Sequence, residues 1–156
     1  MVRIRKATLQ DIPQMTELWL ELMDHHIKLE PYFYRMNKNA IPRYKNYLMK
    51  NIMRRNAEFF VAEDNGKVIA HIGGWVEKRP TCFAIEEQGY LLEAIVSKKY
   101  RRKGIGRKLT KRMLGWFKAK KMSFVVLRAY STNKGAIEAW RRMGFRENWK
   151  LMVKKF

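Results

Sequence analysis

The chain has 156 residues, enough for one domain, spanning 1–156, with a single buried core. It carries 34 Lys and Arg against 14 Asp and Glu, a formal net charge of +20, and its one cysteine excludes an internal disulfide. Because it has no long apolar run, no apolar leader and no Cys/His cluster, we expect a cytoplasmic protein with no membrane partner and no metal.

Hydrophobic periodicity and turn residues predict an alternating α/β plan. Val2 and Ile4 alternate with arginines, as in a half-buried strand, and Thr8 with Asp11 has the spacing of a helix capping box. The turn at 64–66, Asp-Asn-Gly, is typical of a β-hairpin. In chain order, the predicted elements are a strand at 2–5, helices at 12–22 and 41–52, strands at 58–63, 67–75 and 89–96, a helix at 107–121, a strand at 123–130, a helix at 133–143 and a strand at 145–156.

The segment between the strand at 89–96 and the helix at 107–121 indicates an anion-binding turn. Gly104 and Gly106 let the backbone approach a ligand, and the first amide groups of the helix would be unpaired and oriented toward it. The spacing excludes a Walker loop. A dinucleotide fingerprint is also excluded, because position 109 is Leu and no acid that could bind ribose follows.

Positive charge is concentrated around this turn. Residues 94–137 contain no acid and fourteen Lys and Arg. Such a field would attract an anionic ligand, and it is also typical of nucleic-acid binders. The alternative is that the charge serves only solubility.

The pattern Arg101-x-x-Gly104-x-Gly106, preceded by Leu-Leu-Glu-Ala-Ile-Val at 91–96, resembles the acetyl-coenzyme A signature of the GNAT superfamily of N-acetyltransferases. Segments at 2–13, 60–70 and 133–145 resemble other parts of that family, in the family's order. The resemblance implies a mixed α/β fold, with a central sheet of six to seven strands flanked by about four helices. It also implies that the fourth and fifth strands splay apart to admit the pantetheine arm.

Acetyl-CoA is the cosubstrate that this resemblance implies. The strand backbone would form hydrogen bonds with the amides of pantetheine. The backbone amides of the loop, together with its basic side chains, would hold the pyrophosphate. Asn133 would contact pantetheine, cap its own helix, or do both. The residues expected at the coenzyme are Ala94, Ile95, Val96, Arg101, Arg102, Lys103, Gly104, Ile105, Gly106, Arg107, Asn133, Ala136 and Trp140.

Attack of an amine on a thioester requires a proton acceptor. Glu93 is the expected base, since it is the only acid in its apolar strand; the alternative is that it faces away and pairs with an arginine. Trp140 stands where the family commonly has a tyrosine acid, and an indole cannot usefully give up its proton. Tyr130 is therefore the candidate acid, and core packing is the alternative role for Trp140.

The expected function is transfer of an acetyl group from acetyl-CoA to a primary amine of a small molecule or a protein, by a monomer or homodimer. The alternatives are a catalytically weakened acyl-CoA sensor and a basic nucleic-acid-binding module. The N-terminal helices would shape the acceptor pocket, but His25 and His26 are interpreted as polar residues that end a helix.

Overall fold

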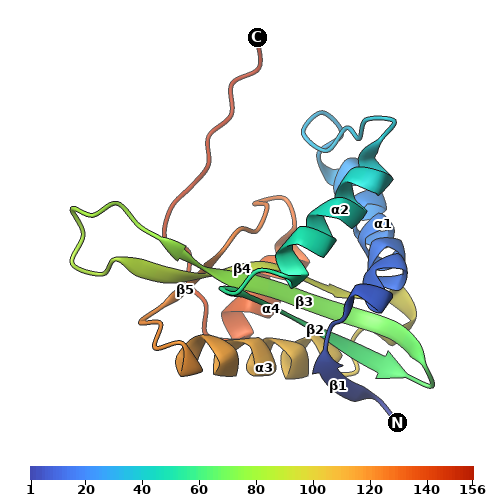
Figure 1. Cartoon of the computed structure of the whole chain (residues 1–156). Coiled ribbons are helices and arrows are strands. Elements are labelled where there is room, and N and C mark those ends of the chain that lie inside the picture. Colours follow the sequence, from blue (N-terminus) through green and yellow to red (C-terminus); the bar gives the residue numbers. More distant parts are fainter.

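The computed structural model describes all residues from 1 to 156 and contains one mixed sheet with the strand order β1-β2-β3-β4-β5 (Figure 1). β1 to β4 are antiparallel neighbours, and β5 runs parallel to β4. The elements are β1 Arg3–Lys6, α1 Ile12–Leu29, α2 Ala40–Ile52, β2 Ala57–Asp64, β3 Lys67–Lys78, β4 Glu87–Val96, α3 Ile105–Ala119, β5 Val125–Leu127 and α4 Lys134–Arg142, with short 3-10 turns at Leu9–Asp11 and Lys98–Tyr100.

Helices cover both faces of the sheet and bury two apolar clusters. Figure 1 shows α1 and α2 on one face and α3 on the other. The first cluster joins Met15 of α1 and Leu48 of α2 to the sheet, and the second joins Leu109 and Met113 of α3 to the opposite face. The predicted α/β plan with four helices is therefore confirmed. None of these helices is long and apolar enough to cross a lipid bilayer.

Glycines in the central strands make room for a buried phenylalanine of α3. A Cβ on Gly74 would lie 2.8 Å from Cζ of Phe117, and a Cβ on Gly89 would lie 2.7 Å from its Cδ1. Real Cβ atoms do not approach so closely, because packed interiors leave no such overlap. Phe117 is 1% exposed as a result, and α3 lies close against β3 and β4.

The hairpin turn lies where the sequence predicted it, and a β-bulge interrupts the pairing of β3 with β4. Asn65 and Gly66 have φ angles of 48° and 77°, the left-handed pair that a tight hairpin requires. In the ladder of β3 and β4, Gly73 pairs with Glu93 and Gly74 with Leu91, so the residue between these two on β4 is the extra one. The bulge thus interrupts β4 immediately before the candidate base.

Two predictions about the last third of the chain are wrong. The sheet has five strands, not six to seven, and the expected strand at 145–156 has no regular structure. This segment extends away from the body, and its large apolar side chains, including Trp149 and Val153, are exposed (Figure 1). The strand expected at 123–130 contains only Val125–Leu127, so β5 offers too short an edge for a further ladder.

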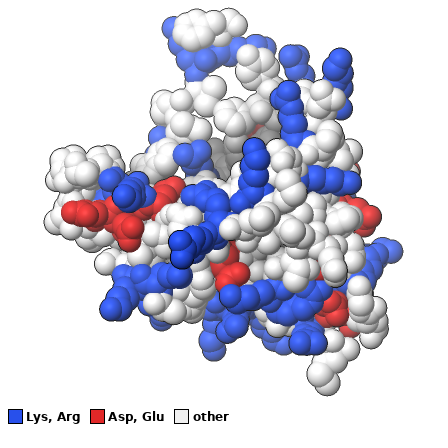
Figure 2. Space-filling view, in the orientation of Figure 1, with Lys and Arg blue, Asp and Glu red and all other residues white.

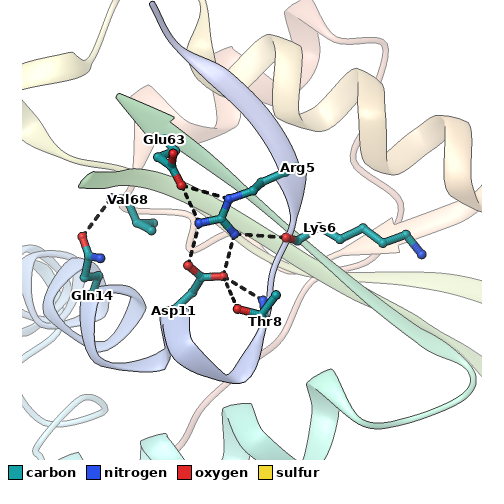
Figure 3. A network of polar contacts seen from close by, with 7 residues as sticks. All are labelled: Arg5, Lys6, Thr8, Asp11, Gln14, Glu63 and Val68. Carbon is teal, nitrogen blue, oxygen red and sulfur yellow. Dashed lines mark hydrogen bonds and ion pairs between the residues drawn. The ribbon is translucent and has the colours of Figure 1, made fainter. Parts of the chain in front are cut away.

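An ion-pair network joins β1, β2 and the start of α1 (Figure 3). The guanidinium of Arg5 donates to both carboxylate oxygens of Asp11 at 2.8 Å, and to Glu63 at 2.6 and 2.9 Å. The Thr8 amide donates to Asp11 at 2.7 Å, which confirms the predicted capping box. Burial would raise the pKa of Asp11, but the hydrogen bonds from Arg5 and Thr8 outweigh it and hold that pKa below its usual value.

His71 of β3 lies fully buried between α1 and the sheet, and neither of its ring nitrogens has a hydrogen-bond partner. Burial lowers its pKa to about 4, whereas an imidazole in the unfolded chain titrates near 6.5. As the pH falls from 6.5 to 4, the unfolded chain binds a proton that the folded chain does not. The contribution of neutral His71 to stability is therefore present above pH 6.5 and is lost toward pH 4.

Replacing His71 by leucine is expected to remove this pH dependence. The difference in the free energy of unfolding, variant minus parent, should increase by up to about 3 kcal/mol as the pH falls from 7.5 to 4. This is the energy that corresponds to lowering the pKa of His71 from 6.5 to about 4. Denaturant titrations at four pH values would measure it. A difference that stays constant with pH would contradict the expectation.

Candidate active site

The turn before α3 presents a row of unpaired amide groups. Gly104 has φ +76° and caps the helix, and α3 begins at Ile105, two residues earlier than predicted. The first amide of the helix to find a partner is that of Lys108, which donates to the Gly104 carbonyl at 3.0 Å. The six preceding backbone N–H groups, from 102 to 107, have no acceptor within the protein. Such a row of free donors at a helix N-terminus can bind an anion, and that it does so stays a prediction.

The Ile105 side chain fixes this turn, while the glycines leave it open. Ile105 is 4% exposed and packs in the same cluster as Leu109. A Cβ on Gly104 would meet nothing within 4 Å, and one on Gly106 would meet only Cγ2 of Val96 at 3.5 Å. Space is therefore available above the amides for a bulky anion.

The basic side chains of the turn are placed differently from one another. Nε of Arg101 donates to the Val96 carbonyl at 3.0 Å, so this side chain folds back on the end of β4. The Lys103 ammonium lies 5.2 Å from the ring centroid of Tyr100. Arg102 is exposed with φ 61°, and none of the three forms an ion pair. That they hold a pyrophosphate stays a prediction.

The splay of the two parallel strands is confirmed, and it leaves one edge of β4 open. β5 pairs with β4 only from Gly89 to Leu91, whereas β3 pairs with β4 as far as Val96. Beyond Leu91, the β5 side of β4 has no partner strand. The Ser97 amide pairs with β3, so alternation along the ladder directs the backbone groups of Ile95 to β3 as well, and those of Ala94 and Val96 to the open side, where Arg101 occupies the Val96 carbonyl. Such an edge can accept amides from a ligand in the way that it would accept another strand.

Glu93 stands on this strand, immediately after the bulge, and its carboxylate is directed toward α2. The hydroxyl of Tyr44 donates a hydrogen bond to Glu93 Oε1. Burial raises the pKa of Glu93 to about 7, and the hydrogen bond from Tyr44 acts in the opposite direction. No arginine or lysine pairs with this carboxylate, so the structure does not support the alternative of an ion pair.

The Tyr44 ring is held in place by the first helix. Trp19 of α1 stacks on it with ring centroids 4.1 Å apart and an interplanar angle of 8°. Tyr44 is 8% exposed, and burial, followed by the charge of Glu93, raises its pKa far above the usual value. The phenol therefore stays protonated and can only donate to Glu93. Tyr44 was not among the residues predicted for the site, because a tyrosine at a core position of a helix gives no local sign of its partner.

Tyr130 lies in an aromatic cluster that the sequence did not predict. Its ring centroid is 4.7 Å from that of Tyr34, 5.6 Å from that of Phe33 and 5.8 Å from that of His26. Burial, then the neighbouring His25, lowers the pKa of His26, whose Nδ1 is buried without a partner. His26 therefore packs into this cluster, and the adjacent His-His pair was the only signal that could have indicated it.

The pKa of Tyr90 on β4 is shifted by its surroundings. Burial raises its pKa, Arg128 opposes the shift, and Glu93 and Tyr130 both add to it. The catalytic roles of Glu93 and Tyr130 stay predictions.

α4 is capped as the sequence predicted. The Asn133 side chain accepts a hydrogen bond from the Ala136 amide at 3.1 Å. Trp140 is partly buried against the apolar cluster between α3 and the sheet. Its ring centroid lies 5.4 Å from that of Phe145, in an edge-on arrangement. The packing role of Trp140 is thereby confirmed, while contacts of Asn133, Ala136 and Trp140 with a coenzyme stay predictions.

Comparison with known proteins agrees with this geometry. The chain matches the acetyltransferase (GNAT) family over residues 15–145. It is 30% identical over 164 residues to an uncharacterised N-acetyltransferase of Methanocaldococcus jannaschii, and the match covers 97% of this chain but 66% of that protein. An N-alpha-acetyltransferase of Sulfurisphaera tokodaii is 27% identical over 158 residues, covering 93% of this chain and 80% of that protein.

A solved structure has the same fold. The crystal structure of a predicted acetyltransferase with acetyl-CoA from Clostridium acetobutylicum superposes with a TM-score of 0.79 at 18% identity. The match covers 99% of this chain and 96% of that one.

Proposed function

The chain belongs to the acetyltransferase (GNAT) family, and we propose that it transfers the acetyl group of acetyl-CoA to the α-amino group of a protein or peptide. The observation that carries this proposal is the placement of Glu93. Its carboxylate has a pKa of about 7 and stands beside an open strand edge that leads to a row of free amides. A base at the thioester end and an anion site at the other end are what such a transfer requires.

The residues of the site fit acetyl-CoA, which would supply an activated thioester. The free amides from 102 to 107 match the oxygens of a diphosphate, and the helix dipole adds to their attraction. The open edge at 94–96 matches the two amides of pantetheine. In the acetyltransferase structure from Clostridium acetobutylicum the ligand is acetyl-CoA.

The pKa of Glu93 favours an α-amine as the acceptor. An α-amino group titrates near 7.7 to 8.0, so roughly one in ten molecules is neutral at pH 7, whereas a lysine amine near 10.4 is almost wholly protonated. A carboxylate half ionised at pH 7 can take the proton from the first kind of amine with little cost. The relative from Sulfurisphaera tokodaii is named an N-alpha-acetyltransferase, which supports this choice.

Proton transfers are assigned to two residues. Glu93 accepts a proton from the attacking amine, directly or through water. Tyr130 donates one to the departing thiolate, from the aromatic cluster that it forms with His26 and Tyr34. A thiolate related to a thiol of pKa near 8.5 is a fair leaving group, so Tyr130 should contribute less to the rate than Glu93.

The test measures thiol release from acetyl-CoA with two peptides of one length. The first has a free N-terminus and no lysine, and the second has a blocked N-terminus and a single lysine. We expect turnover with the first and at most a hundredth of it with the second. Turnover with the second alone would overturn the acceptor class but leave the transferase. Tight coenzyme binding in calorimetry, with no thiol released for any amine, would instead favour the acyl-CoA sensor.

Removing the Tyr44 hydroxyl is expected to change the pH profile. In Tyr44→Phe the burial that raises the pKa of Glu93 is no longer opposed, so that pKa should rise. The acid limb of kcat/KM should move up by about one pH unit, in line with the loss of one hydrogen bond to a charged group. The control is Tyr47→Phe, since the Tyr47 ring lies on the same helix, 6.1 Å from that of Tyr44, and forms no hydrogen bond to Glu93. Equal shifts in both variants would contradict the role of Tyr44.

A further inference from the structure

The outward surface of α3 is almost entirely cationic. Apart from Gly115 and Ala119, every exposed residue of the helix is a lysine or an arginine. The exposed face of α2 differs, because it also carries Ile41, Met49 and neutral polar residues. The exposed basic residues of α3, defined here as the α3 basic face, are Arg107, Lys108, Lys111, Arg112 and Lys118.

No acidic side chain neutralises the α3 basic face. Of the 34 Lys and Arg in the protein, only Arg5, Lys6, Arg141 and Arg142 form ion pairs, and none of these lies on α3. Figure 2 shows lysine and arginine side chains along the lower side of the molecule, where α3 lies in Figure 1. Exposed like charges that are left unpaired destabilise a fold, which suggests an external counter-charge.

Gly115 provides an independent observation at the centre of this face. A glycine inside a helix costs about 1 kcal/mol relative to alanine. Some glycines of this protein make room for side chains, as Gly74 and Gly89 do for Phe117, and others, such as Gly66 and Gly104, have a positive φ. Gly115 has no such role, because a Cβ there would meet nothing within 4 Å. Its position leaves a smooth surface between the cations, over which an extended partner can approach the helix closely.

We propose that the α3 basic face binds the phosphodiester backbone of a nucleic-acid duplex. At a rise of 1.5 Å per residue, Arg107 and Lys118 lie roughly 16 Å apart along the helix, a length over which a duplex presents several phosphates. The binding is separate from acetyl transfer, since it uses side chains on the outer side of α3, of which only Arg107 also belongs to the row of amides at 102–107.

Two other partners fit this face less well. An anionic membrane would require apolar side chains to insert, but those of α3 are used in the core, with Leu109, Met113 and Phe117 at most 1% exposed. An acidic protein would need an aromatic or aliphatic anchor at the centre of the interface, where this face has Gly115 and Ala119. A phosphate backbone needs only cations and close approach.

The test compares two double variants with equal net charge. Lys111→Glu with Lys118→Glu reverses two charges on the α3 basic face, and Lys45→Glu with Lys50→Glu reverses two exposed charges on α2. Fluorescence polarisation with labelled 20-base-pair RNA and DNA duplexes, over a series of salt concentrations, gives the affinity and its salt slope. We expect the first variant to lose at least tenfold in affinity and about two units of slope, and the second to lose less than threefold.

A single substitution at Gly115 distinguishes duplex binding on this surface from coenzyme binding. Gly115→Glu should weaken duplex binding at least fivefold while thiol release from acetyl-CoA stays within twofold of the parent. Equal losses in the two double variants would overturn the proposal, because they would show a diffuse effect of net charge. Binding to vesicles rich in anionic lipid, with no binding to either duplex at 100 mM salt, would also overturn it. Thermal unfolding of each variant verifies that the fold is retained.

Discussion

Replacing Glu93 by glutamine is expected to lower kcat by about a hundredfold or more, the usual contribution of a general base. An amide cannot accept the proton of the amine, but its oxygen can still accept the hydrogen bond from Tyr44, so the site should keep its shape. Thiol release measured with a saturating peptide gives kcat, and calorimetry gives the coenzyme affinity, which should stay within threefold of the parent.

The pH dependence gives this prediction a second readout. Because Glu93 must be ionised to act, kcat/KM of the parent should be half-maximal near pH 7 and fall below it, and the variant should lack this limb. The pKa of Glu93 is about 7 in the folded chain and about 4.3 in the unfolded chain. Protonation of Glu93 therefore stabilises the folded state fully below about pH 4.3, and this stabilisation is lost as the pH rises through about 7. The glutamine variant should therefore gain stability over the parent at pH 8 but not at pH 4.

Glu77→Gln is the matched control, since Glu77 lies on β3 and binds the Gln88 side chain at 2.7 Å. It should leave both kcat and the pH profile unchanged. Full activity of Glu93→Gln, with its pH limb intact, would show that another group removes the proton.

Replacing Gly106 by glutamate should abolish coenzyme binding with little effect on stability. The new carboxylate would stand over the free amides at 102–107, where it would both occupy the donors and repel a diphosphate. Each lost hydrogen bond to a charged group is worth about 1.5 to 3 kcal/mol, so the affinity should fall by a hundredfold or more. An added Cβ would make only an ordinary contact with Val96, and an acid in the first turn of a helix is stabilising.

Gly115→Glu is the control for this experiment, because it places the same charge on the same helix about two and a half turns away. Calorimetry with acetyl-CoA and thermal unfolding should be run on both variants. Loss of coenzyme binding in Gly106→Glu alone supports the anion site at the start of α3. Similar losses in both would mean that the overall field of α3, rather than its first amides, holds the coenzyme.

Local sequence was sufficient to predict the glycine turn before α3. Gly104 must adopt a positive φ and Gly106 must leave space, and both requirements follow from residue type alone. The hairpin at 64–66 and the cap at Asn133 were predicted for the same reason, since turns and caps are made by neighbours in the chain. The order of the elements likewise followed from hydrophobic periodicity.

Sequence alone also placed an acid at 93 in an apolar strand, but it could not show which way the acid faces. A bulge of one residue reverses the side to which later side chains point, and its presence depends on the partner strand. The tertiary structure therefore decided that Glu93 meets Tyr44 of α2, 49 positions away, and that burial brings its pKa to about 7.

The number of strands and the aromatic cluster were also decided by tertiary structure. The apolar residues from Trp149 to Val153 have strand-like composition, yet a strand forms only where a neighbour offers an edge, and β5 ends at Leu127. His26 near the end of α1, Tyr34 in the following turn and Tyr130 in the loop after β5 meet because these segments lie close together in space. What the sequence determined about this protein is what adjacent residues impose on the backbone, whereas pairing between distant segments depends on packing that no short pattern encodes.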